Sequence, residues 1–167
     1  MMRITILLLA LICSNLNAQN VGKTKEFTVE YPDSMHVTTV GGIYALLMPL
    51  ENSEDDFREN LNILSQYDPA FKDMSLKDIV DMNLAYLKTM GVEITEPVEL
   101  TFGKKKLAAY SVDYITDKLS QGLNLHIWQA YVKHKKKLFI ITYTAKVASY
   151  SKYYDAMMKL VSTINLK

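Results

Sequence analysis

Hydrophobic and polar residues alternate along much of this chain with the period of two that is typical of strands. Residues 26–31 alternate strictly, which predicts a half-buried strand. In the segment 57–67 the pattern places Phe57, Leu61 and Ile63 on one face. Further strands are predicted over residues 36–40, 43–50, 92–102 (interrupted by Pro97), 105–116, 123–133 and 137–145. Short polar turns separate the last four strands, which indicates antiparallel neighbours.

Two segments instead repeat their apolar residues with helical spacing. The first begins at Ser75 and ends at Gly91. Ser75 and Asp78, three residues later, form a pattern close to a capping box. Its apolar positions are Leu76, Ile79, Val80, Leu84 and Leu87. The second helix is predicted over residues 149–164. Its expected buried stripe consists of Tyr150, Tyr154, Met157, Met158, Val161 and Ile164.

The late strands are apolar on both faces. In the segment 137–145, Leu138 and Ile140 lie on one face, while Phe139 and Ile141 lie on the other. The strand before it has the same property, and a strand that is apolar on both sides has to be covered on both sides. With two amphipathic helices available, we predict an α+β fold. An antiparallel β-sheet meander carries one helix on each face, which makes a three-layer α/β/α sandwich.

Residues 1–18 have the layout of a secretory signal peptide. Arg3 precedes an apolar run over residues 4–13, and small and polar residues then lead to Ala18. The apolar run is too short to span a bilayer, which takes about twenty residues. We therefore expect cleavage before Gln19 and export of the chain to the periplasm or the extracellular space.

Two alternatives to cleavage before Gln19 are lipidation of Cys13 and retention of the leader. Lipidation of Cys13 would make the protein an anchored lipoprotein, although Ile12 stands where a lipobox has Gly, Ala or Ser. An uncleaved leader would also serve as an anchor. Cys13 is the only cysteine, so the chain after Ala18 has no disulfide, thiol nucleophile or zinc–thiolate site.

The chain after the leader has the size of one domain and a balanced charge. We expect a flexible N-terminal segment over residues 19–25 and a single domain over residues 26–167, without a transmembrane segment. The whole chain has 19 basic and 18 acidic residues, and loss of Arg3 makes the two numbers equal. This balance argues against nucleic acid as a partner. Arg58 is the only remaining arginine, so a two-point carboxylate or phosphate site is not indicated.

We find no motif for catalysis, a cofactor or a metal. The sequence has neither a Gly-x-Ser-x-Gly elbow nor a glycine-rich phosphate loop. His36, His126 and His134 lack the spacing of a metal site. We interpret His126 as a partly buried sheet residue and His134 as a solvated turn residue. The acidic segment 51–56 lacks the alternating ligands of a calcium loop and is interpreted as a solvated loop.

Two lysine-rich turns are the clearest candidate for a binding site. They lie two turns apart in the predicted meander, and alternate turns of a meander fall at the same end of the sheet. Seven lysines would therefore produce a local positive field. These residues are Lys104, Lys105, Lys106, Lys133, Lys135, Lys136 and Lys137. The alternative is that lysine keeps the hairpin tips soluble and prevents edge pairing.

The order of elements and parts of the sequence resemble the PsbP-like superfamily, which includes the extrinsic photosystem II subunit and DcrB-type bacterial envelope proteins. The similar segments are residues 27–32 (FTVEYP), the helix opening at Ser75, residues 137–145 (KLFIITYTA) and the following aromatic helix 150–164. Met35 departs from the family, which often has Trp there, and no photosystem-binding segment is recognisable. The resemblance implies a non-catalytic accessory or binding role, and the leader is similar to those of secreted Bacteroidetes proteins.

Together these features favour an exported, non-enzymatic protein of the cell envelope that needs no cofactor. Its partner would be another envelope protein or an anionic envelope surface, and the oligomeric state stays open. The alternative is a small hydrolase or ligand carrier that uses a pocket between helix and sheet. A deep pocket with convergent polar groups would favour the alternative, whereas a filled core and a bare lysine-rich end would favour the first hypothesis.

Overall fold

The computed structural model describes residues 19–118 and 122–167. The strands are β1 (Gln19–Lys23), β2 (Phe27–Pro32), β3 (His36–Val40), β4 (Ile43–Leu47), β5 (Asn60–Gln66), β6 (Glu93–Ile94), β7 (Val98–Phe102), β8 (Leu107–Thr116), β9 (Leu125–His134), β10 (Lys137–Lys146) and β11 (Asn165–Leu166). The helices are the 3-10 turn η1 (Pro69–Lys72), α1 (Leu76–Thr89) and α2 (Tyr150–Thr163). The predicted signal peptide lies outside the described residues.

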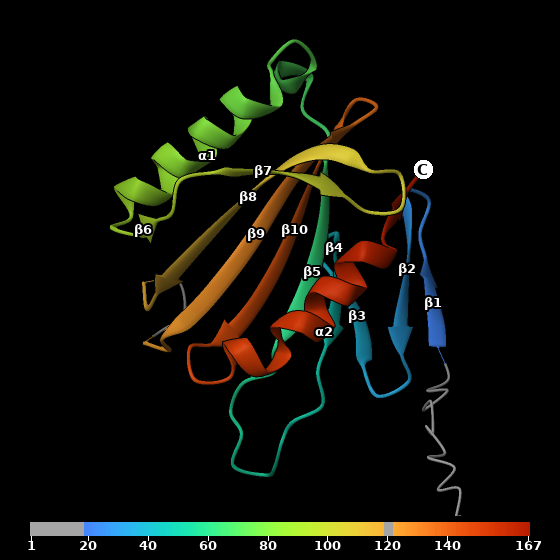
Figure 1. Cartoon of the computed structure of the whole chain (residues 1–167), viewed down its shortest axis with the longest axis vertical. Coiled ribbons are helices and arrows are strands. Elements are labelled where there is room, and N and C mark those ends of the chain that lie inside the picture. Colours follow the sequence, from blue (N-terminus) through green and yellow to red (C-terminus); the bar gives the residue numbers. More distant parts are fainter. Residues whose placement is uncertain (1–18, 119–121) are drawn as a thin grey trace, which may run out of the picture.

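An eight-stranded antiparallel sheet forms the centre of the molecule (Figure 1), with the order β3-β4-β5-β10-β9-β8-β6 and with β7 also paired to β8. The ladder between β9 and β10 runs from Lys137 opposite His134 to Lys146 opposite Leu125. Only two residues connect these strands, and Lys135 takes the left-handed conformation with φ 56° that such a tight turn needs. A second sheet of three strands has the order β1-β2-β11.

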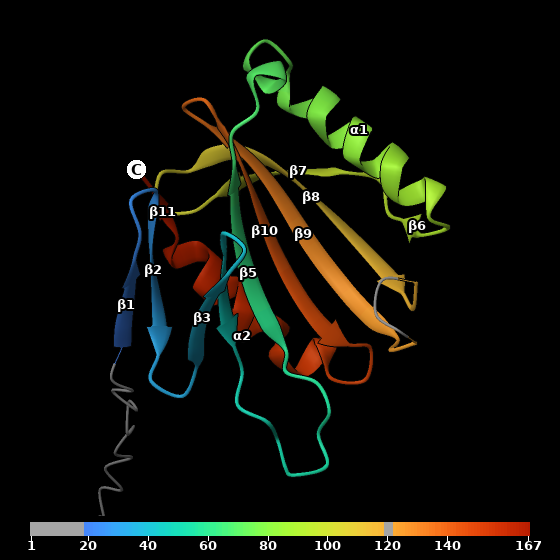
Figure 2. The same ribbon diagram turned by 180° about the vertical axis from the view of Figure 1, so that it is seen from behind.

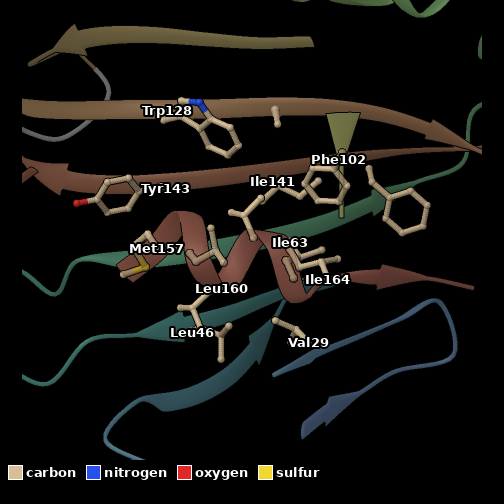
Figure 3. Close-up of a cluster of buried hydrophobic side chains, with 14 of the residues drawn as sticks. Val29, Leu46, Ile63, Phe102, Trp128, Ile141, Tyr143, Met157, Leu160 and Ile164 are labelled. Atoms are coloured by element: carbon tan, nitrogen blue, oxygen red, sulfur yellow. The ribbon is translucent and has the colours of Figure 1, made fainter. Parts of the chain in front are cut away.

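The two helices cover opposite faces of the large sheet, as predicted. α1 buries Ile79 and Val80 in one cluster with Tyr131 and Leu138 of the sheet. α2 packs on the other face, where Met157 and Leu160 meet Trp128, Ile141 and Tyr143 (Figure 3). The view from behind shows α2 on the far side of the sheet (Figure 2). The three-layer α/β/α arrangement is thus confirmed, and the small sheet adds cover beside α2 through Phe27 and Val29.

Local sequence signals explain the position of α1. The Ser75 hydroxyl accepts a hydrogen bond from the backbone N–H of Asp78 at 3.1 Å, which satisfies one free donor of the first turn. Gly91 follows the C-cap with φ 76°, a conformation that glycine adopts without steric cost. Both ends of the helix therefore lie where the sequence predicts them. Among the described residues, no helix is long and apolar enough to cross a bilayer.

Several local predictions need correction. Residues Gln19–Lys23, expected to be flexible, form β1 because their backbone pairs with β2. Gly22 permits this, since a Cβ atom there would come within 2.1 Å of the Tyr44 hydroxyl oxygen. Phe57 does not share a face with Leu61 and Ile63, because it precedes β5 and packs in the cluster under α1.

The buried stripe of α2 also differs in part from the prediction. Leu160 is buried although the prediction omitted it, whereas Tyr154 and Met158 are only partly buried at the rim of the cluster. The reason is that α2 spans both the large sheet and β2. The apolar stripe is therefore centred on Met157 and Val161.

Candidate functional site: the lysine-rich end of the sheet

The two lysine-rich turns lie at the same end of the sheet, as the meander predicts (Figure 1). The first turn joins β7 to β8 between Phe102 and Leu107, which face each other in the ladder. The second joins β9 to β10 between His134 and Lys137. Because Ala109 of β8 lies opposite Val132 of β9, the start of β8 adjoins the end of β9. We call this set of seven lysines the basic pole.

Three of the seven lysines are held by other groups. Lys104 forms an ion pair with Glu30, and Lys137 forms one with Glu26. Lys133 donates hydrogen bonds from Nζ to the backbone carbonyls of Lys72 at 3.1 Å and Met74 at 2.6 Å. These lysines tie the turns to β2, to the residue that precedes β2 and to the segment before α1. They are therefore part of the frame of the site.

The other four lysines are exposed and have no acidic partner among the described residues. Lys105 and Lys106 occupy the first turn, and Lys135 and Lys136 occupy the second. Lys106 and Lys135 have positive φ angles of 51° and 56°, so each stands at the tight point of its turn. The free positive charge of the pole is thus concentrated in two pairs of adjacent residues.

A hollow of about 550 Å³ lies beside the second turn, and the sequence did not predict it. Lys25 and Lys167 line the hollow with Lys135 and Lys136, and the ring of Tyr67, which is 61% exposed, forms part of its wall. Lys25 and Lys167 stand near the two ends of the described chain. They meet because β11 pairs with β2 and the Lys167 backbone N–H donates to the Glu26 carbonyl at 2.7 Å. A two-residue strand gives no hydrophobic periodicity that could reveal this contact.

His134 lies between the lysines and is not the solvated turn residue that the sequence indicated. It is the last residue of β9, and its Nε2 atom is buried. Burial lowers the pKa of His134 below its ordinary value, and the positive charges of Lys105 and Lys135 lower it further, against a smaller opposing effect of the Lys167 backbone. Lys105 belongs to the first turn and His134 adjoins the second, so a charge of the first turn acts on a group at the second turn.

The two carboxylates beside the basic pole, Glu26 and Glu30, already form ion pairs with lysines. Burial alone would raise the pKa of Glu26, but the hydrogen bond of Lys137, the contact with Ser65 and the charge of Lys137 together outweigh it, so the pKa is lowered. Glu26 is therefore ionised at neutral pH and balances Lys137 only. An anion that approaches the four free lysines meets no competing carboxylate from this pair.

His126 is a partly buried sheet residue, as the sequence indicated, but its partner was missed. Its Nε2 atom lies 2.9 Å from Oδ1 of Asp113, and the Tyr150 hydroxyl donates to the same oxygen at 2.8 Å. The ring of His126 stacks on Tyr150, the first residue of α2. This cluster joins the start of α2 to β8 and β9. The described residues contain no group of three or more metal ligands, and His36 is an exposed residue of β3.

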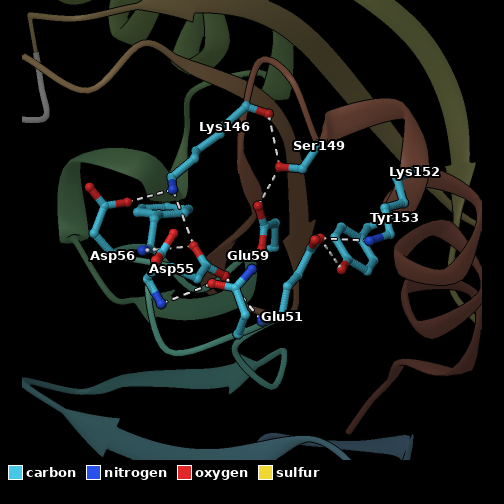
Figure 4. A network of polar contacts seen from close by, with 11 residues as sticks. Glu51, Asp55, Asp56, Glu59, Lys146, Ser149, Lys152 and Tyr153 are labelled. Atoms are coloured by element: carbon cyan, nitrogen blue, oxygen red, sulfur yellow. Dashed lines mark hydrogen bonds and ion pairs between the residues drawn. The ribbon is translucent and has the colours of Figure 1, made fainter.

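The acidic segment 51–56 is not a free loop (Figure 4). Lys146 pairs with Asp55 at 3.1 Å and also with Asp56, while Lys152 pairs with Glu51 at 2.7 Å. The backbone N–H of Glu51 and then Lys146 hold the pKa of Asp55 below its ordinary range. The carboxylates are thus engaged by lysines of β10 and α2. They fix this loop to the start of α2.

The comparisons with known proteins rest on structure, since no protein-family model matches the chain and no curated protein is significantly similar to it. PsbP (CyanoP) from Synechocystis sp. PCC 6803 superposes with a TM-score of 0.63 at 14% identity, over 93% of this chain and 96% of that chain. LpqN from Mycobacterium tuberculosis, described as involved in cell envelope biogenesis, gives 0.58 at 10% identity, over 89% and 90%. This chain has the PsbP-like fold. The fold predicted from the sequence is therefore confirmed over nearly the whole described chain.

A third match shows how far proteins with the PsbP-like fold differ. The Ran-binding protein Mog1p from Saccharomyces cerevisiae superposes with a TM-score of 0.54 at 10% identity, over 89% of this chain and 95% of that chain. At such identities the likeness concerns the arrangement of helices and strands. The chemistry of the site has to be argued from the residues of this chain.

Proposed function

We propose that this protein is an exported, non-catalytic binding protein of the cell envelope that docks to anionic lipid headgroups through its basic pole. The observation that carries the proposal is the placement of Lys105, Lys106, Lys135 and Lys136. These four exposed lysines lie in two adjacent turns without an acidic partner among the described residues.

The charge of the pole is suited to a surface rather than to one small ligand. Lysine ammonium groups are mobile, strongly hydrated point charges, whereas arginine provides the rigid two-point contact of a specific anion site. Each lysine close to an anionic membrane contributes about 1 kcal/mol of attraction, and the effect decays within a Debye length. Four lysines together correspond to about 4 kcal/mol, which is enough for reversible docking.

The frame of the pole supports the same proposal. Lys104, Lys133 and Lys137 use their charges or hydrogen bonds to hold the turns against β2 and the segment before α1. The backbone of the two turns consequently needs little ordering when a surface binds. A site on turns that are fixed by a rigid sheet is preorganised.

The envelope location is supported by two independent observations. The leader over residues 1–18 has the charged start, apolar core and small cleavage residue of an exported protein. Among proteins with the PsbP-like fold, LpqN is described as involved in cell envelope biogenesis. The described part of the chain contains no group of three or more possible metal ligands.

Flotation of the purified protein with lipid vesicles tests the proposal. The protein should float with vesicles that contain phosphatidylglycerol and stay in solution with vesicles of phosphatidylcholine alone. Binding should weaken steeply when salt is added, because exposed charges are screened beyond about 8 Å at physiological ionic strength. Equal binding to both vesicle types, or binding that salt does not change, would overturn the proposal.

A further inference from the structure

A second cleft lies between α2 and β2, away from the tips of the lysine-rich turns. It has a volume of about 460 Å³, within the range of sites for small molecules. Its lining combines apolar side chains with a few polar groups from β1, β2 and α2. The residues are Gln19, Glu30, Pro32, Met35, Met48, Ala156, Met157, Lys159, Leu160 and Thr163.

The floor of this cleft is apolar and adaptable. Met157 is fully buried, and Met35 and Leu160 are also buried, while Met48 is half-buried. Methionine side chains are unbranched and polarisable, so they adjust to apolar ligands of different shape. Half-buried Pro32 and Met48 and the exposed Ala156 supply the apolar surface above this floor that a hydrophobic chain would cover.

The walls of the cleft are fixed to each other. The Thr163 hydroxyl of α2 accepts a hydrogen bond from the backbone N–H of Glu30 in β2 at 3.0 Å. The same hydroxyl donates to the Leu160 carbonyl at 2.8 Å and so remains bound to its own helix. α2 and β2 therefore hold their separation without a ligand, and the cleft is largely preformed.

The charge at the rim selects the head of the ligand. Only two charged residues line the cleft, Glu30 and Lys159. Glu30 is already paired with Lys104, whereas Lys159 is exposed and has no acidic partner among the described residues. The uncompensated charge is therefore positive, which suits an anionic head group at Lys159.

We propose that the cleft between α2 and β2 binds a single-chain amphiphile with an anionic head, such as a fatty acid. The alkyl chain lies over Pro32, Met48 and Ala156, above the buried Met35 and Met157, and the carboxylate is placed at Lys159. This site is independent of the basic pole and goes beyond the docking function proposed above. It would make the protein a carrier or sensor of such amphiphiles.

Calorimetric titration of the purified protein with dodecanoate tests this inference. Ala156→Phe would place a bulky ring in the cleft, and Ala85→Phe makes the same change at an exposed position of α1. We expect saturable binding to the parent and to Ala85→Phe, and at least tenfold weaker binding to Ala156→Phe. Equal thermal midpoints for the two variants would show that the loss does not come from unfolding.

Two further comparisons separate this site from the basic pole. Lys159→Glu should weaken dodecanoate but not dodecyltrimethylammonium, which has the same chain and a cationic head. Reversal of Lys105 and Lys136 should leave dodecanoate binding unchanged, even if it abolishes vesicle binding. The inference is wrong if Ala156→Phe binds dodecanoate like the parent, if the parent shows no saturable binding, or if the Lys105 and Lys136 reversal removes the binding.

Discussion

Reversal of one free lysine in each turn gives the sharpest prediction for the basic pole. In the variant Lys105→Glu/Lys136→Glu, each substitution removes one favourable charge and adds one unfavourable charge. At about 1 kcal/mol per charge near an anionic membrane, each reversal costs about 2 kcal/mol and the pair costs about 4 kcal/mol. Since 1.4 kcal/mol corresponds to a factor of ten, the double variant should bind vesicles roughly a thousandfold more weakly.

The single variants make the test quantitative. Lys105→Glu or Lys136→Glu alone should weaken binding about thirtyfold at low salt, because the neighbouring turn still attracts the surface. Both residues are exposed and neither forms an ion pair with another described residue, so folding should not change. Equal denaturation curves for parent and variants would verify this.

The matched control is Lys88→Glu/Lys118→Glu, which changes the net charge by the same amount. Lys88 lies in the last turn of α1, and Lys118 follows β8 at the opposite end of the strand from the lysine-rich turns. This variant should bind vesicles almost like the parent. If the Lys105 and Lys136 double variant binds as well as the parent at low salt, the lysines only keep the turns soluble and the docking function is refuted.

Three other predictions concern the leader, the core and the pH dependence. Mass spectrometry of the exported protein should give a chain that begins at Gln19, and a lipidated chain that begins at Cys13 would instead establish a lipoprotein. Leu84→Ala should lower the free energy of unfolding by about 2–5 kcal/mol and Ile141→Val by about 0.5–1.5 kcal/mol. Leu84 and Ile141 lie in clusters on opposite faces of the sheet. The losses measured by urea denaturation should therefore add within about 0.5 kcal/mol in the double variant. His134 has a pKa below its ordinary 6.5, so the unfolded chain takes up the proton first and stability should fall as pH drops from neutral through the folded pKa. His134→Gln should lose less stability over this range, and a variant with the parent's full pH dependence would show that another group causes the loss.

The large sheet and its two helices were predictable because their signals are local or periodic. The alternation of Leu138 with Phe139 shows directly that β10 has two apolar faces, and these faces are buried under α1 and α2. Ser75 and Gly91 mark the ends of α1 because capping depends on residues within a few positions. The placement of both lysine-rich turns at one end followed from the meander alone.

The parts that could not be predicted depend on contacts between distant segments. β1 has no apolar alternation, and its order comes from backbone pairing with β2 and from the fit of Gly22 against Tyr44. Asp113 approaches His126 only through the register of β8 against β9. The division of the basic pole into held and free lysines also depends on Glu26, which is far away in the sequence.

Nuclear magnetic resonance mapping tests the docking function most directly. Titration of the isotope-labelled protein with phosphatidylglycerol nanodiscs should change the amide signals of residues 103–106 and 134–137, together with those of Lys25 and Lys167. Phosphatidylcholine nanodiscs should leave these signals unchanged. Changes confined to other surfaces, such as the exposed face of α1, or no changes at low salt, would contradict the assignment of the basic pole as the site where this protein meets an anionic envelope surface.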